Sequence, residues 1–71
     1  MNDPSHRLRD LRRLYERAFA EFGAAALWNR RPVANPSPGD ALAVARALRR
    51  EGDMDARRLA EDIEAAANAA H

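Results

Sequence analysis

The sequence predicts an all-α fold, a three-helix bundle in which a long first helix packs on a C-terminal helical hairpin. Two observations lead to this prediction. Apolar residues recur at alternating steps of three and four along three segments, the pattern of one face of an α-helix. A single glycine, Gly52, separates the last two segments, and glycine suits the left-handed residue that ends a helix. The 71 residues are enough for one domain.

We expect the first helix to run from about residue 4 to 28. Asp3 is a favoured N-cap, and Pro4 suits the first helical position because its missing N–H would have no partner there. Gly23 lies inside the apolar pattern, which continues through it, so we expect a weakened point and not the end of the helix. The apolar stripe is Leu8, Leu11, Tyr15, Ala18, Phe22 and Ala25, flanked by Leu14, Phe19 and Ala26.

A linker over about residues 29–37 follows. Its prolines at 32 and 36, with Pro38 after it, favour extended backbone at the residues before them, so the linker should be stiff. The second helix is expected at about 38–51, since Ser37 and Asp40 have the spacing of a capping box. Its predicted buried residues are Ala41, Val44, Ala45 and Leu48, with Leu42 beside them.

The third helix is expected at about 54–70, with Asp53 as its N-cap. Because Gly52 and Asp53 alone separate it from the second helix, the two must form a tight hairpin. Its predicted buried residues are Ala56, Leu59, Ile63, Ala66 and Ala70.

The core that these helices can build is small, because 17 of the 33 apolar residues are alanine. A single core in a chain this short supplies about 3–5 kcal/mol, and there is no cysteine for a disulfide. A first helix of about 35 Å would also overhang the shorter hairpin. We therefore expect a protein partner, or a second copy of the chain, to cover part of the first helix. The candidate interface residues are Leu11, Tyr15, Phe19, Phe22 and Trp28.

The segment Trp28-Asn29-Arg30-Arg31-Pro32 is the most distinctive local feature. Trp28 has two interpretations. It either closes the end of the bundle against Val33, or it anchors a partner, since Trp and Arg are enriched among the residues that dominate binding energy.

Four arginines of the first helix are candidate phosphate contacts, which makes a small nucleic-acid-binding protein the alternative function. They are Arg9, Arg12, Arg13 and Arg17. Asp10, Glu16 and Glu21 lie three or four positions from several of them and offer ion pairs, so the same face is also explained as a solvated one. A DNA-reading helix-turn-helix is not favoured, because Arg58 stands where that motif needs an apolar residue.

Residues for catalysis are not evident, so we expect no enzyme activity, no cofactor and no small-molecule substrate. The chain has no cysteine, two serines and no glycine-rich phosphate loop. Glu51, Asp53 and Asp55 lack the glycine that a calcium loop needs, so we expect helix caps and no metal site. No apolar run is long enough to span a membrane and no leader peptide is evident, so we expect a cytoplasmic protein. The many Arg and Ala residues are typical of GC-rich bacterial genomes.

Four short segments carry a resemblance to a protein group. They are Ala26-Leu27-Trp28-Asn29, Asp40-Ala41-Leu42-Ala43, Arg49-Arg50-Glu51-Gly52-Asp53-Met54 and Arg58-Leu59-Ala60-Glu61. They resemble small uncharacterised proteobacterial helical proteins encoded beside nucleotidyltransferase-type proteins of toxin–antitoxin or abortive-infection type. The resemblance covers about residues 14–67 and implies an antitoxin-like or accessory subunit that docks on an enzyme. From residues and resemblance together, we expect a non-enzymatic protein-interaction module or a homo-oligomer, with an inhibitor of a larger complex as a further alternative.

Overall fold

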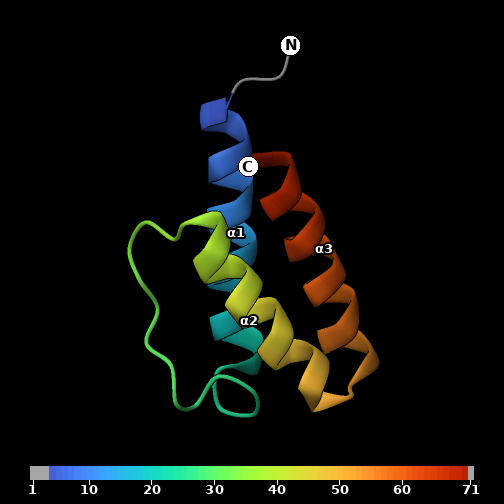
Figure 1. The fold of residues 1–71 in the computed structure, drawn as a ribbon. Helices are drawn as coiled ribbons and strands as arrows, with labels where there is room; N and C mark the ends of the chain where they lie inside the picture. Colours follow the sequence, from blue (N-terminus) through green and yellow to red (C-terminus); the bar gives the residue numbers. More distant parts are fainter. Residues whose placement is uncertain (1–3, 71) are drawn as a thin grey trace.

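This computed structural model describes residues 4–70 of the chain, with side chains for residues 8–69. The described residues form three helices and the connections between them, and they contain no strand. The helices are α1 (Pro4–Phe22), α2 (Pro38–Glu51) and α3 (Met54–Ala70). α1 and α2 run in roughly the same direction, and the connection between them returns along the outside of the bundle (Figure 1). α3 runs back against both helices and packs on each of them. The predicted all-α three-helix bundle is therefore confirmed.

The ends of α2 and the start of α3 follow the capping residues in the sequence. Ser37 Oγ accepts the backbone N–H of Asp40 at 3.1 Å, and Asp40 Oδ2 accepts that of Ser37 at 2.9 Å, which completes the capping box. Gly52 ends α2 in the left-handed conformation, with φ of 80°. Asp53 Oδ1 accepts the N–H of Asp55 at 2.8 Å. The predicted N-cap Asp3 lies outside the described residues.

The end of α1 differs from the prediction, because the helix stops at Phe22 and not near residue 28. The N–H groups of Ala26 and Leu27 both point at the carbonyl oxygen of Phe22, at 2.8 and 3.3 Å, so a turn replaces the helical ladder. A Cβ added at Gly23 would overlap the carbonyl oxygen of Phe19, which makes glycine necessary at this turn. The expectation that the helix continues through Gly23 is therefore wrong.

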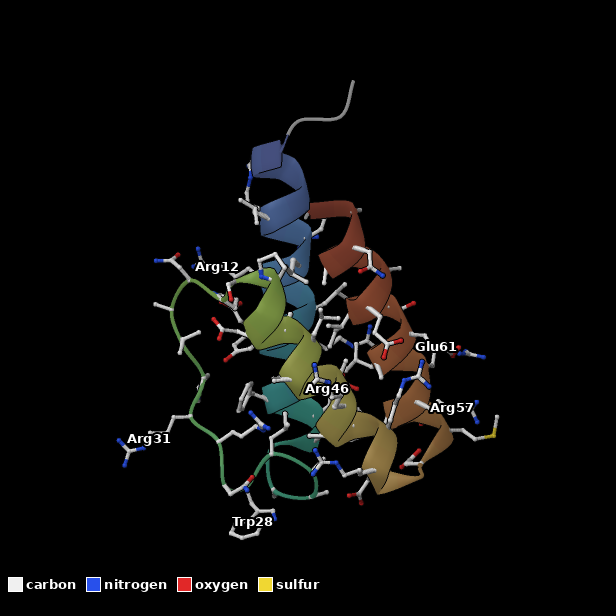
Figure 2. All side chains as sticks on the ribbon, viewed as in Figure 1. Arg12, Trp28, Arg31, Arg46, Arg57 and Glu61 are labelled. Atoms are coloured by element: carbon white, nitrogen blue, oxygen red, sulfur yellow. The ribbon has the colours of Figure 1, made fainter. Side chains whose placement is uncertain are left out.

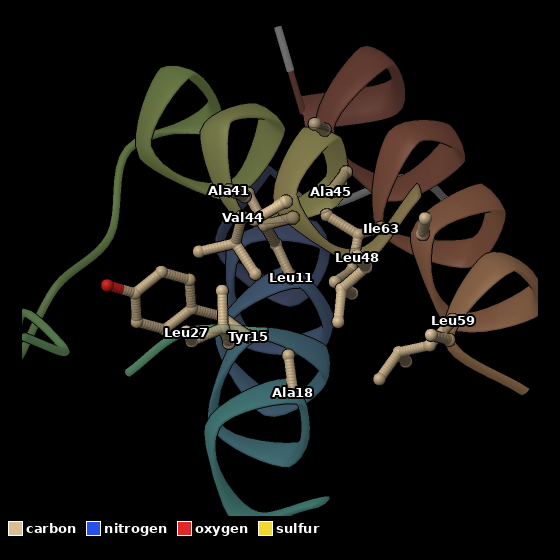
Figure 3. Packing of buried hydrophobic residues seen from close by; sticks show 14 residues of the cluster. Leu11, Tyr15, Ala18, Leu27, Ala41, Val44, Ala45, Leu48, Leu59 and Ile63 are labelled. Atoms are coloured by element: carbon tan, nitrogen blue, oxygen red, sulfur yellow. The ribbon is translucent and has the colours of Figure 1, made fainter. Parts of the chain in front are cut away.

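The core lies where the three helices meet, and Leu11, Leu27, Leu48, Ile63 and Val44 are its largest fully buried side chains (Figure 3). All four residues predicted as the buried stripe of α2 are in it. On α3, Ala56, Leu59 and Ile63 are buried as expected, and Ala60 and Ala67 join them, while Ala66 is half-buried. The side chain of Ala70 lies outside the described residues.

The stripe of α1 is buried only in its middle, at Leu11, Tyr15 and Ala18. Leu8 is 45% exposed, and Ala25 is exposed because the helix has already ended. With 19 residues against the 17 of α3, α1 is only slightly the longer helix. The first turn of α1 still projects past the hairpin (Figure 1), but the helix is shorter than predicted, so the overhang is smaller than the sequence implies. None of the helices described in residues 4–70 is long and apolar enough to cross a membrane.

One ion pair ties α2 to α3. The guanidinium of Arg49 donates to both carboxylate oxygens of Glu64, at 2.7 and 2.6 Å. This hydrogen bond lowers the pKa of Glu64 below its ordinary value, against a smaller opposing effect of burial. Both side chains are partly exposed, 40% for Arg49 and 30% for Glu64, so water weakens the pair.

The close approach at Gly23 predicts that Gly23→Ala destabilises the fold. The added methyl group must displace the Phe19 carbonyl or distort the turn, which should lower the free energy of unfolding by about 1–3 kcal/mol. Urea denaturation followed by circular dichroism measures the change. Gly39→Ala is the matched control, because the nearest atom to its added Cβ is Ser37 Oγ at an ordinary 3.7 Å. Equal effects from the two substitutions would contradict this explanation of the turn.

The Arg49–Glu64 pair predicts a pH-dependent contribution to stability. Because the folded protein lowers the pKa of Glu64, the pair stabilises the fold above the unfolded-state value of about 4.3, and the contribution is lost as pH falls through the lowered folded-state pKa. Denaturation curves of the native chain and Glu64→Gln should therefore differ at neutral pH and converge in acid. Glu61→Gln, on the same helix, should show a smaller difference. If the difference in stability between the native chain and Glu64→Gln grew as the pH fell, the predicted direction of the pH dependence would be wrong.

Candidate binding surface

The connection between α1 and α2, residues 23–37, is ordered although it contains no helix. Loops longer than about 12–15 residues without secondary structure are uncommon in compact domains, and they are usually either functional segments or linkers. Leu27 fixes its first part by entering the core, with 1% of its surface exposed. Val33 donates its backbone N–H to the Tyr15 hydroxyl oxygen at 3.0 Å, and Pro36 is buried where the segment meets α2. The connection is thus attached to the bundle at three points.

Trp28 projects from this connection into solvent at the end of the bundle (Figure 2). It is 76% exposed, and Val33 is 46% exposed, so the interpretation in which they close the bundle together is wrong. The turn after Phe22 is the reason. It directs Leu27 inward, and the N–H of Arg30 then donates to the Leu27 carbonyl at 3.0 Å, which leaves Trp28 on the outside of a second turn.

Two shallow hollows lie between the connection and α2. One, of about 270 Å³, has Trp28 and Arg50 in its walls, and the other, of about 100 Å³, has Tyr15 and Arg31 in its walls. Arg30 borders both, and we treat the two as one candidate surface. We call it the loop–α2 surface and define it by the residues that give it its chemistry, Ala26, Trp28, Arg30, Arg31, Ala47 and Arg50.

The arginines of the loop–α2 surface have no internal counter-ion. Arg30, Arg31 and Arg50 are exposed, and none of them forms an ion pair with any residue in the described range. Three other arginines do form pairs: Arg12 with Glu16, Arg17 with Glu21, and Arg49 with Glu64. The loop–α2 surface therefore contains Trp28 and three arginines without ion pairs in the described range, and Glu51 and Asp40 are the carboxylates that border its hollows.

The five predicted interface residues do not lie together on one surface. Leu11 and Tyr15 are in the core, because α2 and α3 cover that part of α1, and only a small part of Tyr15 reaches the wall of the smaller hollow. Phe19 and Phe22 are half-buried against the core, and the ring centroids of Phe19 and Tyr15 are 5.1 Å apart. Trp28 alone of the five exposes most of its side chain.

Sequence reasoning missed three residues that accompany Trp28 on this surface, Arg30, Arg31 and Arg50. The Trp-Asn-Arg-Arg segment pointed at the first two, since Trp28, Arg30 and Arg31 are almost adjacent in the chain. Arg50 carried no such signal, because only the return of α2 past the connection brings it beside Trp28.

Arg9, Arg12, Arg13 and Arg17 on α1 are exposed, as the nucleic-acid alternative requires. Two of the four are nevertheless paired on their own helix: Arg12 Nε lies 3.2 Å from Glu16 Oε1, and Arg17 donates to Glu21. The hydrogen bond that Arg17 donates to Glu21 raises the pKa of Arg17. Arg9 and Arg13 make no ion pair with the described residues. The positive charge of this face is therefore half neutralised by neighbouring carboxylates.

Within the described residues, no three His, Cys, Asp or Glu side chains are grouped so as to hold a metal ion. Comparison with models of known protein families, with curated proteins and with solved structures found no match to this chain.

The hydrogen bond to Val33 predicts that Tyr15→Phe loosens the connection without unfolding the bundle. The ring stays in the core, but the Val33 N–H loses its acceptor, which should lower the free energy of unfolding by about 0.5–1.5 kcal/mol. Hydrogen exchange followed by NMR should show faster exchange at the Val33 amide and little change at Val44, inside α2. An unchanged exchange rate at Val33 would show that Tyr15 does not hold the connection.

Proposed function

We propose that this chain is a non-catalytic protein-binding module, whose loop–α2 surface docks on a partner with Trp28 as the anchor. The observation that carries the proposal is the exposed Trp28 on an ordered segment. An aromatic side chain has about 150–250 Å² of surface to bury. At about 25 cal/mol per Å², covering the exposed three-quarters of Trp28 is worth on the order of 3–5 kcal/mol.

This is a gross transfer free energy, and the entropy lost on association opposes it. The bundle leaves this energy unused, although Leu27, the preceding residue, is fully buried. A binding partner would recover it, and the neighbouring arginines support the same interpretation because Trp and Arg dominate binding energy at protein interfaces.

The resemblance noted in the sequence makes an enzyme encoded nearby the first partner to test, with this chain as its antitoxin-like or accessory subunit. A second copy of the chain is the other candidate, and light scattering distinguishes the two. Nucleic acid binding through Arg9, Arg12, Arg13 and Arg17 is the less supported function, because Glu16 and Glu21 neutralise half of that face. If that function held, binding would weaken steeply with salt and would depend on Arg9 and Arg13.

The proposal predicts that Trp28→Ala abolishes partner binding and leaves the fold intact. Removing an anchor of this kind costs at least about 2 kcal/mol of binding free energy, or about 30-fold in affinity. The free energy of unfolding should change by less than about 0.5 kcal/mol, as for other exposed positions. Co-purification from the native host, followed by titration calorimetry with the partner obtained, measures both affinities.

Met54→Ala is the matched control, because Met54 is 83% exposed and borders a different hollow, on α3. It should leave the affinity unchanged. A partner that binds the Trp28→Ala chain as tightly as the native one would remove the proposal. So would a chain that light scattering shows to be a monomer and that brings no protein with it from its host.

A further inference from the structure

We infer that the loop–α2 surface takes an acidic peptide segment, which places one large apolar side chain beside Trp28 and its carboxylates on Arg30 and Arg50. This inference rests on the proposed function and adds the chemistry of the partner. Three features of the surface lead to it: the shape and lining of the hollow next to Trp28, the balance of charge around it, and the scarcity of exposed aromatic rings.

The hollow next to Trp28 offers an apolar side chain a few apolar groups within a mostly polar wall. Its volume is about 270 Å³, and Trp28, Ala25, Ala26 and Ala47 line it together with Asn29, Arg30, Arg50 and Glu51. Ala47 is buried and Ala26 half-buried, so the exposed indole of Trp28 is the main apolar group there. A large apolar side chain entering it would contact both the methyl groups and the indole ring.

Charge around the hollow selects an acidic partner. Arg30 and Arg50 border it, Arg31 follows along the connection, and Glu51 is the single carboxylate at its rim. Asp40, in the smaller hollow, already accepts the N–H of Ser37. Guanidinium groups bind carboxylates through paired hydrogen bonds, so two acidic side chains near the apolar one would find donors at Arg30 and Arg50, which border the same hollow as Trp28.

A peptide fits this surface better than a nucleic acid strand does. Proteins that bind single strands stack successive bases on several aromatic rings. Trp28 is the one exposed aromatic side chain of residues 8–69, since Tyr15 is buried and Phe19 and Phe22 are half-buried. The net charge of the chain is also only +1, which is too small to favour a polyanion.

Selection from a random displayed peptide library tests the inference. The full chain serves as the target, and peptides that also bind Trp28→Ala are removed. The enriched sequences should combine a large apolar residue with Asp or Glu on both sides of it. Because Trp28 is the only tryptophan, its fluorescence reports binding directly, and an enriched synthetic peptide should shift its emission to shorter wavelength. Added salt should weaken this binding.

Arginine variants test whether the carboxylates of the peptide bind Arg30 and Arg50. The double substitution Arg30→Ala with Arg50→Ala should weaken the peptide at least tenfold, while Arg57→Ala with Arg58→Ala, on α3, should leave it unchanged. Circular dichroism checks that both variants are folded. Enriched peptides without acidic residues, the absence of peptides that depend on Trp28, or tighter binding of an oligothymidylate would each overturn the inference.

The outcome for the proposed function is read separately, from the native partner. If Trp28→Ala loses that partner and the selected peptides are not acidic, the docking surface stands and its acidic occupant is wrong. If Trp28→Ala keeps the partner, both proposals fall.

Discussion

The burial of Leu27 is the contact on which the surface of this protein depends. The chain has 16 large apolar side chains in 71 residues, so each one that enters the core matters to stability. Leu27 reaches the core only because α1 ends at Phe22 and the chain turns at Gly23. The same turn places the next residue, Trp28, in solvent. One backbone feature thus completes the core and creates the candidate anchor.

Tyr15 links the core to the surface that we propose for binding. Its ring packs among the helices, and its hydroxyl accepts the N–H of Val33 at the edge of the core (Figure 3). With Leu27 and the buried Pro36, this hydrogen bond restrains a connection that has no helix of its own. An anchor held on a restrained backbone loses less entropy on binding than one on a flexible segment, which favours affinity.

The distribution of ion pairs separates two kinds of arginine. Arg12, Arg17 and Arg49 meet carboxylates one helical turn away or on the neighbouring helix, and they are accounted for by the fold. Arg30, Arg31 and Arg50 meet none among the described residues. Arg30 and Arg50 border the hollow that Trp28 lines, whereas Arg31 borders the smaller one. Exposed arginines are common, so their proximity to an exposed indole carries the argument, and their number alone would not.

The sequence by itself determined the fold class, the ends of α2 and α3 and most of the core. Those features follow from local rules: Ser37, Asp40, Gly52 and Asp53 act on adjacent backbone, and apolar spacing sets which side of a helix is buried. Only the tertiary structure decided where α1 ends and which of Leu27 and Trp28 is buried. Apolar spacing continues past Gly23, whereas the packing of the turn against Phe19 and Phe22 does not permit the helix to follow it. The position of Arg50 beside Trp28 likewise arises from the return path of α2, which no local pattern encodes.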